Sequence, residues 1–164
     1  METHQKFMQK AISLSQKNLK TLDGGPFGCV IVRDGKVLSA EPNTVTLDCD
    51  PTAHAEINAI RSASKKIGKA DLSGCIMYTS AEPCPMCLSA IYWSNISQVY
   101  YGNTKRDAEW AGFGDEFISE QLGKKIEEQD ISFGRIMASD AIKAFEEWVA
   151  AGSELKEKIK DGSM

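Results

Sequence analysis

Four residues in two separate segments of the chain carry the side chains best suited to chemistry. His54 and Glu56 lie in the first segment, and Cys84 and Cys87 lie in the second, spaced as Cys-x-x-Cys. One imidazole and two thiolates suit zinc, and three protein ligands leave its fourth tetrahedral position open for water. A structural zinc site would need a fourth protein ligand, and the only other histidine, His4, lies near the N-terminus. The set therefore predicts a catalytic site for one zinc ion.

Glu56 follows His54 by two residues and carries a carboxylate that the metal does not require. Zinc lowers the pKa of a water molecule at its open position toward neutrality, and a nearby carboxylate can pass the water proton to a leaving group. This combination favours hydrolytic removal of an amino group. On its own, Cys84-x-x-Cys87 could be a redox dithiol or half of a structural zinc site, but neither alternative explains His54 and Glu56.

Both halves of this set fall near predicted helix starts. Thr52 is a candidate N-cap for a helix over Ala53–Lys66, and Pro85 favours the first turn of a helix that continues over Met86–Trp93. Helix N-termini carry partial positive charge, which stabilises thiolates, and their free N–H groups can donate to ligand sulfur. We therefore expect His54 and the two cysteines to lie at two helix N-termini.

The remaining apolar patterns predict an α/β sandwich with a mixed sheet. The predicted strands are a hairpin of Phe27–Val32 and Lys36–Ala40 around Asp34-Gly35, followed by Leu72–Tyr78, Ile96–Tyr101 and Gly134–Ala138. The further predicted helices cover Phe7–Leu22, Asp115–Leu122 and Ala141–Ile159, and the predicted loops cover Glu41–Pro51 and Gly102–Gly114. The strand–helix–strand unit of residues 72–101 should be a parallel crossover.

The composition is that of an ordinary globular protein with one domain. The chain has 164 residues, of which 42% are hydrophobic and 26% are charged. Its net charge of −4 argues against nucleic acid as the main partner. No apolar run approaches the roughly 20 residues that span a bilayer, and Met1–Lys10 lacks the apolar core of a signal peptide. The five cysteines are an odd number and predict no disulfide framework, so we expect a cytoplasmic location.

The sequence around the four residues resembles a known enzyme family. The stretches that carry the resemblance include both metal motifs and their neighbours: Gly24–Gly28, Asp50–Glu56, Tyr78–Ser80, Glu82–Cys87, Ala90–Trp93 and Ala111–Phe113. They are similar to the cytidine deaminase-like superfamily of zinc deaminases, whose pattern is H-x-E followed by P-C-x-x-C. Tyr92-Trp93 and the Ala-Gly-Phe-x-Asp loop that ends at Asp115 resemble the bacterial-type guanine deaminases in particular.

The resemblance implies a role for each member of a set of nine residues. His54, Cys84 and Cys87 would bind one zinc ion, and Glu56 would carry protons. The purine base would be bound by Phe27, Asn43, Trp93 and the backbone N–H of Ala55, while Asp115 would recognise the guanine N–H edge and help to move protons. The reaction would be the hydrolysis of guanine to xanthine and ammonia, in purine catabolism or salvage.

The substrate-binding roles also have structural alternatives. Phe27 and Trp93 lie in apolar runs and could be core residues, Asn43 could cap a turn, and Asp115 could cap the helix that follows it. A non-catalytic zinc-binding module is a further alternative, although such proteins commonly lose the carboxylate that Glu56 supplies.

The resemblance also implies a fold and an assembly. Residues 1–164 would form a single domain, a three-layer α/β/α sandwich with a mixed five-stranded sheet, and two copies would form a homodimer that exchanges C-terminal segments. Bacterial relatives end in an aromatic residue that closes over the partner's substrate, whereas no Phe, Tyr or Trp follows Trp148 here. This departure leaves a nucleoside substrate (guanosine, adenosine or cytidine) as an alternative, and a tRNA adenosine substrate is a further one that the negative charge disfavours.

Overall fold

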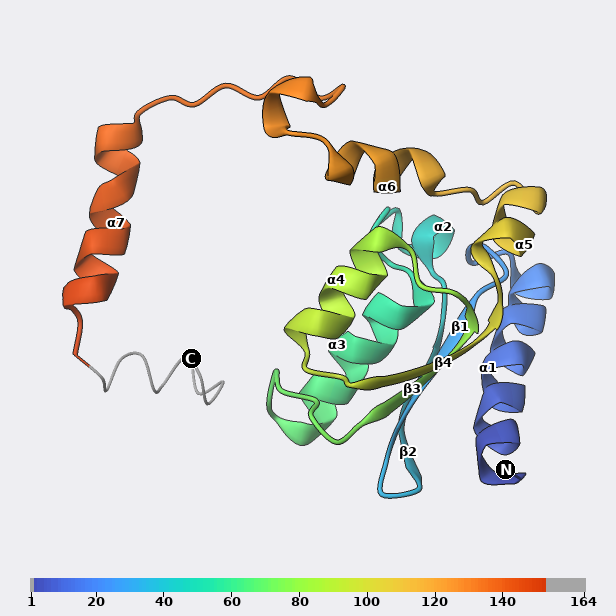
Figure 1. The fold of residues 1–164 in the computed structure, drawn as a ribbon. Helices are drawn as coiled ribbons and strands as arrows, with labels where there is room; N and C mark the ends of the chain where they lie inside the picture. Colours follow the sequence, from blue (N-terminus) through green and yellow to red (C-terminus); the bar gives the residue numbers. More distant parts are fainter. Residues whose placement is uncertain (1, 153–164) are drawn as a thin grey trace. The chain divides into compact units, whose positions relative to one another are not determined.

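The structure is a computed structural model that describes residues 2–152, shown in Figure 1. The chain divides into two compact units, Met1–Glu116 and Phe117–Met164. All nine candidate residues lie in the first unit, so its architecture determines the site. Across the described residues, none of the helices combines the length and the apolar character that crossing a membrane requires.

The first unit is built around a mixed four-stranded sheet with the order β2-β1-β3-β4. The strands are β1 (Gly28–Arg33), β2 (Lys36–Pro42), β3 (Ile76–Ala81) and β4 (Gln98–Asn103). β1 pairs antiparallel with both β2 and β3, whereas β3 and β4 are parallel, as the predicted crossover requires. The predicted hairpin is confirmed, and its turn residues Asp34 and Gly35 both have the positive φ that a tight primed turn needs.

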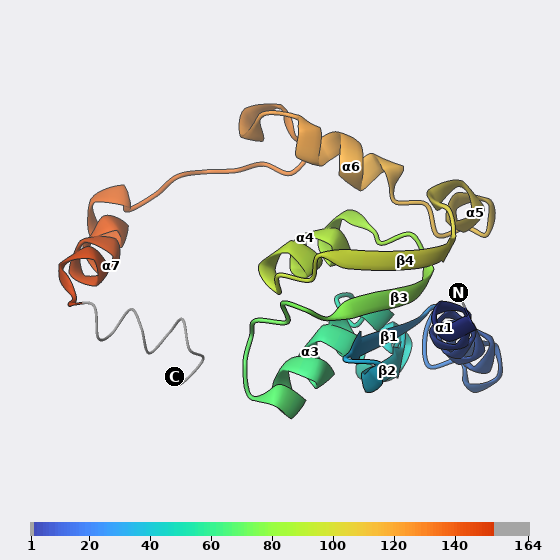
Figure 2. The same ribbon diagram turned by 60° about the horizontal axis from the view of Figure 1, so that its bottom comes forward.

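Helices cover both faces of this sheet. The longer ones are α1 (Glu2–Thr21), α3 (Ala55–Ile67) and α4 (Pro85–Trp93), and the short ones are α2 (Val45–Asp48) and α5 (Lys105–Trp110). Figure 2 shows α1 on one side of the sheet and α3 and α4 on the other, which gives the three predicted layers. Because β3 leads into α4 and α4 leads back to β4, the Cys-x-x-Cys loop follows the carboxyl end of a central strand.

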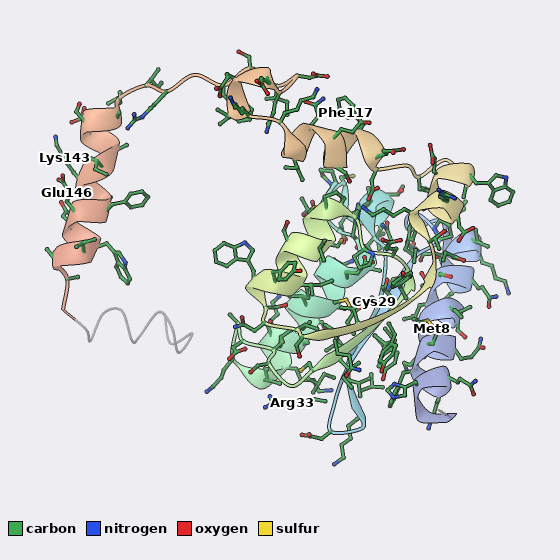
Figure 3. All side chains as sticks on the ribbon, viewed as in Figure 1. Met8, Cys29, Arg33, Phe117, Lys143 and Glu146 are labelled. Carbon is green, nitrogen blue, oxygen red and sulfur yellow. The ribbon has the colours of Figure 1, made fainter. Side chains whose placement is uncertain are left out.

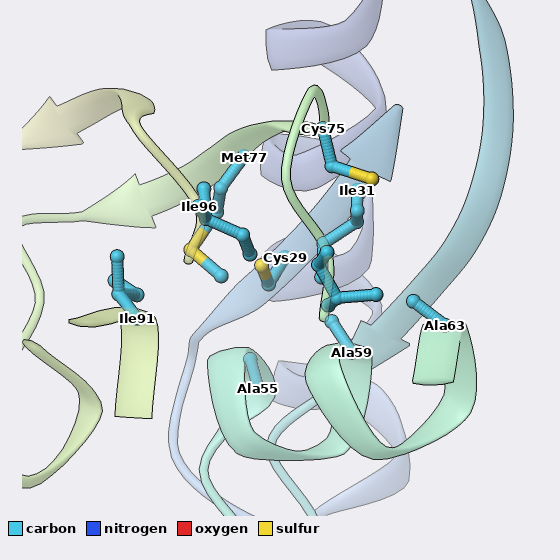
Figure 4. Close-up of a cluster of buried hydrophobic side chains, with 10 residues drawn as sticks. Cys29, Ile31, Ala55, Ala59, Ala63, Cys75, Met77, Ile91 and Ile96 are labelled. Atoms are coloured by element: carbon cyan, nitrogen blue, oxygen red, sulfur yellow. The ribbon is translucent and has the colours of Figure 1, made fainter. Parts of the chain in front are cut away.

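Alternate residues of β1 belong to two separate cores. Cys29 and Ile31 face α3 and α4, while Val30 and Val32 face α1, as the two-residue period of a strand requires. The first core is drawn in Figure 4, and its members are Cys29, Ile31, Ala55, Ala59, Ala63, Leu72, Cys75, Met77, Ile91 and Ile96. The small alanines on α3 allow this helix to lie close to the sheet, and Cys29 lies in the interior in Figure 3.

The second unit contains most of α6 (Glu116–Gly123), a 3-10 turn at Ile126–Glu128, and α7 (Ala138–Ala150). None of these helices has a buried residue, and Figure 3 labels Phe117 on α6 and Lys143 and Glu146 on α7.

The prediction of a fifth strand over Gly134–Ala138 is wrong for this structure. No described residue pairs with this segment, Met137 has a positive φ of 51°, and Ala138 already begins α7. A strand needs a hydrogen-bonding partner as well as an apolar pattern. The predicted final helix over Ala141–Ile159 is confirmed from Ala141 to Ala150. The structure begins this helix earlier, at Ala138, and ends it at Ala150 with Ala151 as the C-cap, and residues 153–159 lie outside the described part of the chain.

Candidate metal centre

The loop before α3 positions His54 at the start of that helix. The carboxylate of Asp50 accepts hydrogen bonds from both the N–H and the hydroxyl of Thr52, each at 2.7 Å. Thr52 is therefore not the N-cap that we predicted; His54 takes that position, with extended backbone angles, and α3 begins at Ala55. The Asn58 amide of α3 donates hydrogen bonds to the carbonyls of Pro42 and Ala53, which lie at the two ends of the segment between β2 and α3.

The second ligand segment is the N-terminus of α4. Cys84 is the N-cap and Pro85 is the first helical residue, as predicted. The Cys84 sulfur accepts a hydrogen bond from the backbone N–H of Cys87 at 3.5 Å, so the two thiols lie on the same side of the first turn. The helix start thus supplies both a partial positive charge and a donor to ligand sulfur.

The three predicted ligands converge. The Nδ1 atom of His54 lies 3.5 Å from the sulfur of Cys84 and 3.5 Å from the sulfur of Cys87, and all three ligand atoms lie within 4.8 Å of one another. Tetrahedral zinc with ordinary Zn–N and Zn–S lengths separates a nitrogen and a sulfur ligand by about 3.6 Å. The donor set and its spacing therefore fit one zinc ion per chain.

The charges of the metal-free ligands are coupled. Hydrogen bonds from the Cys87 side chain, from His54 and from the Cys87 backbone N–H lower the pKa of Cys84 to about 4. The side-chain hydrogen bond between the two cysteines raises the pKa of Cys87, and the bond to Cys84 raises that of His54. At neutral pH the site thus already carries one thiolate, beside a proton that a metal ion must displace.

Glu56 lies next to this cluster and is buried. It is 5% exposed; its Oε1 accepts a hydrogen bond from Thr79 Oγ1 at 2.7 Å, and its Oε2 lies 3.5 Å from the sulfur of Cys87. Burial raises the pKa of this carboxyl, which favours a group that must gain and lose a proton near neutral pH.

Asn43 is buried in the loop after β2, and its amide has a fixed orientation. Its Oδ1 accepts backbone N–H groups from Gly25 at 3.2 Å and Val45 at 3.1 Å, so its side-chain NH₂ points away from both. Asn18 on α1 donates to the Asn43 carbonyl at 2.7 Å, and the Asn43 N–H donates to Phe27 at 3.1 Å. The alternative that Asn43 caps a turn is thus partly correct, since its oxygen bonds Val45, yet the NH₂ group stays available as a donor.

Phe27 and the loop before α6 form the next part of the surroundings. The rings of Phe27 and Phe113 pack edge to face with centroids 5.1 Å apart. Asp115 follows two residues later, with Oδ1 3.7 Å from Lys105 Nζ, and its charge helps to raise the pKa of His54. Asp115 therefore lies near enough to the metal ligands to interact with them electrostatically.

The last two of the nine residues, Ala55 and Trp93, differ in their exposure and in their distance from the metal ligands. Ala55 is fully buried in the first turn of α3, where backbone N–H groups have no partner within the helix. Trp93 is 87% exposed at the end of α4, about 9 Å along the helix from Cys87 and about 240° around its axis. The structure does not bring Trp93 to the metal ligands of its own chain, so its substrate contact stays a prediction.

Sequence reasoning missed three residues around the site. Thr79 lies in β3, one residue beyond the predicted strand Leu72–Tyr78, and its hydroxyl donates to Glu56. The Asn18 amide donates a hydrogen bond to the Asn43 carbonyl, and Lys105 forms an ion pair with Asp115. Thr79 lies two residues after the core residue Met77, so extending the strand by its two-residue period would have placed it on the Glu56 side.

Comparisons with known proteins agree with this geometry. The family of the cytidine and deoxycytidylate deaminase zinc-binding region matches residues 1–103. The guanine deaminase of Bacillus subtilis (strain 168) is 44% identical over 145 residues, which are 88% of this chain and 93% of that protein. A tRNA-specific adenosine deaminase from Agrobacterium fabrum is 38% identical over 96 residues, 58% of this chain and 62% of that protein.

Solved structures show the same relationship. The X-ray structure of the Bacillus subtilis guanine deaminase has a TM-score of 0.88 at 43% identity, covering 91% of this chain and 95% of that one. A guanine deaminase structure from Nitrosomonas europaea has a TM-score of 0.63 at 33% identity, covering 66% of this chain and 63% of that one. With its ligand atoms at zinc spacing beside a buried carboxylate, the chain belongs to the cytidine and deoxycytidylate deaminase family of zinc-dependent aminohydrolases.

Proposed function

We propose that the protein hydrolyses guanine to xanthine and ammonia. The observation that carries the proposal is the convergence of His54, Cys84 and Cys87 at zinc-ligand spacing with the buried carboxylate of Glu56 beside them. The choice of guanine rests on the 44% identity to a guanine deaminase that this chain matches over 93% of its length. The nucleoside and tRNA alternatives are not favoured, because the guanine deaminase matches over 88% of this chain, whereas the tRNA-specific relative matches over only 58% of it.

The residues of the chain divide the reaction between them. His54, Cys84 and Cys87 would hold the zinc ion, which would supply Lewis acidity and make water nucleophilic near neutral pH. Glu56 takes a proton from the attacking water and gives it to the amino nitrogen, so that water and guanine become xanthine and ammonia. Burial suits Glu56 to this task, because a raised carboxyl pKa allows it to hold the proton between the two steps.

The purine would be held by groups around the cluster. The NH₂ of Asn43 would donate to an acceptor on the base, and the Ala55 N–H at the helix start would donate to the ring. Phe27, packed edge to face against Phe113, offers an apolar surface. The Asp115 carboxylate would accept from the guanine N–H edge and help to move protons. The position of Asp115 near His54 supports this assignment.

We further propose a homodimer in which C-terminal segments are exchanged, with residues 1–164 as one domain and a cytoplasmic location. The second unit supports the assembly, because α7 carries Ile142, Phe145 and Val149 at helical spacing and all three are exposed. A second copy that covers this stripe would bury it. The relatives' C-terminal aromatic residue has no counterpart after Trp148, and most of the residues after Trp148 lie outside the described part of the chain.

The test is a substrate panel with zinc quantified. Full-length zinc-loaded protein is incubated with guanine, adenine, cytosine and the matching nucleosides, and ammonia release is measured. We expect conversion of guanine to xanthine; guanine left unchanged while another substrate is deaminated would refute the substrate assignment. The Glu56→Gln variant should keep one zinc per chain and lose about 10²- to 10⁴-fold in turnover. Retained turnover in that variant would contradict the mechanism.

A further inference from the structure

The carboxylate of Glu56 is held by a residue with no role in metal or purine binding. Thr79 Oγ1 donates to Glu56 Oε1 at 2.7 Å, and Thr79 is fully buried. We propose that Thr79 is a positioning residue for proton transfer, which holds Oε1 so that Oε2 is the oxygen that takes and gives the proton. The proposal rests on the proposed function, in which Glu56 carries the proton.

The backbone of Thr79 is paired on both sides within the sheet. Thr79 lies in β3, which has a strand on each side, and it pairs with Cys29 of β1 and Tyr101 of β4. Its side chain shares a face with Met77, which packs in the core against α3, the helix that carries Glu56. A β-branched side chain in a strand also has few χ1 rotamers. The hydroxyl is thus held at a fixed point opposite the start of α3.

The two oxygens of Glu56 have different surroundings. Oε1 receives the Thr79 hydroxyl, whereas Oε2 lies 3.5 Å from the sulfur of the metal ligand Cys87. The Thr79 hydroxyl can donate to Oε1 whether Glu56 is charged or neutral, because a neutral carboxyl that is protonated on Oε2 keeps Oε1 as an acceptor. Proton uptake and release are therefore left to the oxygen on the metal side.

Loss of the hydroxyl would leave Glu56 buried without the hydrogen bond that orients Oε1, so that its terminal torsion is less constrained. Such sp³–sp² torsions are broad, so packing alone does not fix the carboxylate plane. A proton carrier that is misplaced by about 1 Å loses much of its efficiency. Zinc binding, in contrast, depends on His54, Cys84 and Cys87, whereas the Thr79 hydroxyl bonds Glu56. A positioning role thus predicts a defect in turnover with the metal site intact.

The experiment compares Thr79→Val with Thr79→Ser in the full-length zinc-loaded protein. Valine keeps the shape and removes the hydroxyl; serine keeps the hydroxyl. We expect Thr79→Val to lower kcat about 10- to 100-fold, with KM within about twofold and one zinc per chain, and Thr79→Ser to restore most of kcat. The matched control is Ser39→Ala, which removes another buried hydroxyl that bonds α3, at the Ala59 carbonyl at 2.8 Å, away from Glu56.

A second readout does not depend on turnover. In infrared difference spectra of the zinc-loaded proteins, the carboxylate band that Glu56→Gln removes should shift in Thr79→Val and stay in place in Thr79→Ser and Ser39→Ala. An unshifted band, an unchanged kcat, or a loss of zinc together with kcat in Thr79→Val would overturn the proposal. A wild-type protein that is inactive on guanine would refute the proposed function, while the infrared comparison would still decide the role of Thr79.

Discussion

Asn18 lies on α1, outside every motif that carries chemistry, yet its amide holds the loop that presents Asn43. Its Nδ2 donates to the Asn43 carbonyl at 2.7 Å and to the Gly25 carbonyl at 2.9 Å, and Asn18 is 2% exposed. The Asn18→Ala variant removes both donors at once. We expect this single change to affect both the stability of the protein and its binding of substrate.

The magnitude follows from what each carbonyl retains. The Gly25 carbonyl keeps the N–H of Phe27 at 2.8 Å, so its loss is one ordinary hydrogen bond, worth about 1 kcal/mol. The Asn43 carbonyl loses the donor described above, and an unsatisfied buried acceptor costs about 1–3 kcal/mol. Together these changes predict a decrease of about 2–4 kcal/mol in the free energy of unfolding.

The assay has two parts, because Asn43 and Glu56 are held by different residues. Urea denaturation followed by circular dichroism, at one fixed zinc concentration, measures the loss of stability. Steady-state kinetics should show a rise in KM for guanine with a much smaller change in kcat, since Thr79 still holds Glu56 in this variant.

The control is Ser13→Ala on the same helix. The Ser13 hydroxyl bonds the Gln9 carbonyl on the exposed side of α1, so its removal should change the free energy of unfolding by less than about 0.5 kcal/mol. A loss below about 1 kcal/mol for Asn18→Ala, or a fall in kcat with KM unchanged, would refute the reasoning.

Two further predictions concern the same site. A Cβ added at Gly24 would overlap the Asn43 Oδ1, so Gly24→Ala should raise KM for guanine. The control is Gly123→Ala, which has open space around its Cβ and should leave KM unchanged. An equal change of KM in the two variants would contradict this prediction. Zinc binding to metal-free protein should release at least one proton at pH 8, because the pKa of the Cys87 thiol is raised. More protons should be released at pH 6, which lies below the raised pKa of His54, so the apparent zinc affinity should decrease as the pH is lowered. Calorimetry in buffers of different ionisation enthalpy measures the number of protons released, and zinc binding without proton release would contradict the prediction.

Features that depend on neighbouring residues were predictable from the sequence. The Asp34-Gly35 turn and the start of α4 at Pro85 both follow from backbone preferences that act within a few residues. The zinc ligands were predictable for a chemical reason, since His54 and Cys84-x-x-Cys87 match the donor preference of one metal. Even α5 had a local signal, because Thr104 and Asp107 form a capping box that we had placed in a loop.

Features that depend on competition or distant pairing were not predictable. Thr52 has the right side chain for an N-cap, but Asp50 accepts its hydroxyl hydrogen and the helix begins two residues later than predicted. The pattern of residues 134–138 suits a strand, yet nothing local reveals whether a neighbouring strand is available. The contact of Thr79 with Glu56 joins residues 23 positions apart, so no short motif encodes it.

Three consecutive residues of β3 bond to three different elements through their side chains. The Tyr78 hydroxyl lies 2.7 Å from Nδ1 of His4 near the N-terminus, Thr79 bonds Glu56 on α3, and Ser80 accepts the N–H of Gly28. Because side chains alternate across a strand, an insertion or deletion of one residue here would exchange all of these contacts between the two faces. In a library of variants, insertions and deletions of one residue within β3 should therefore abolish function, whereas conservative substitutions such as Thr79→Ser should be tolerated.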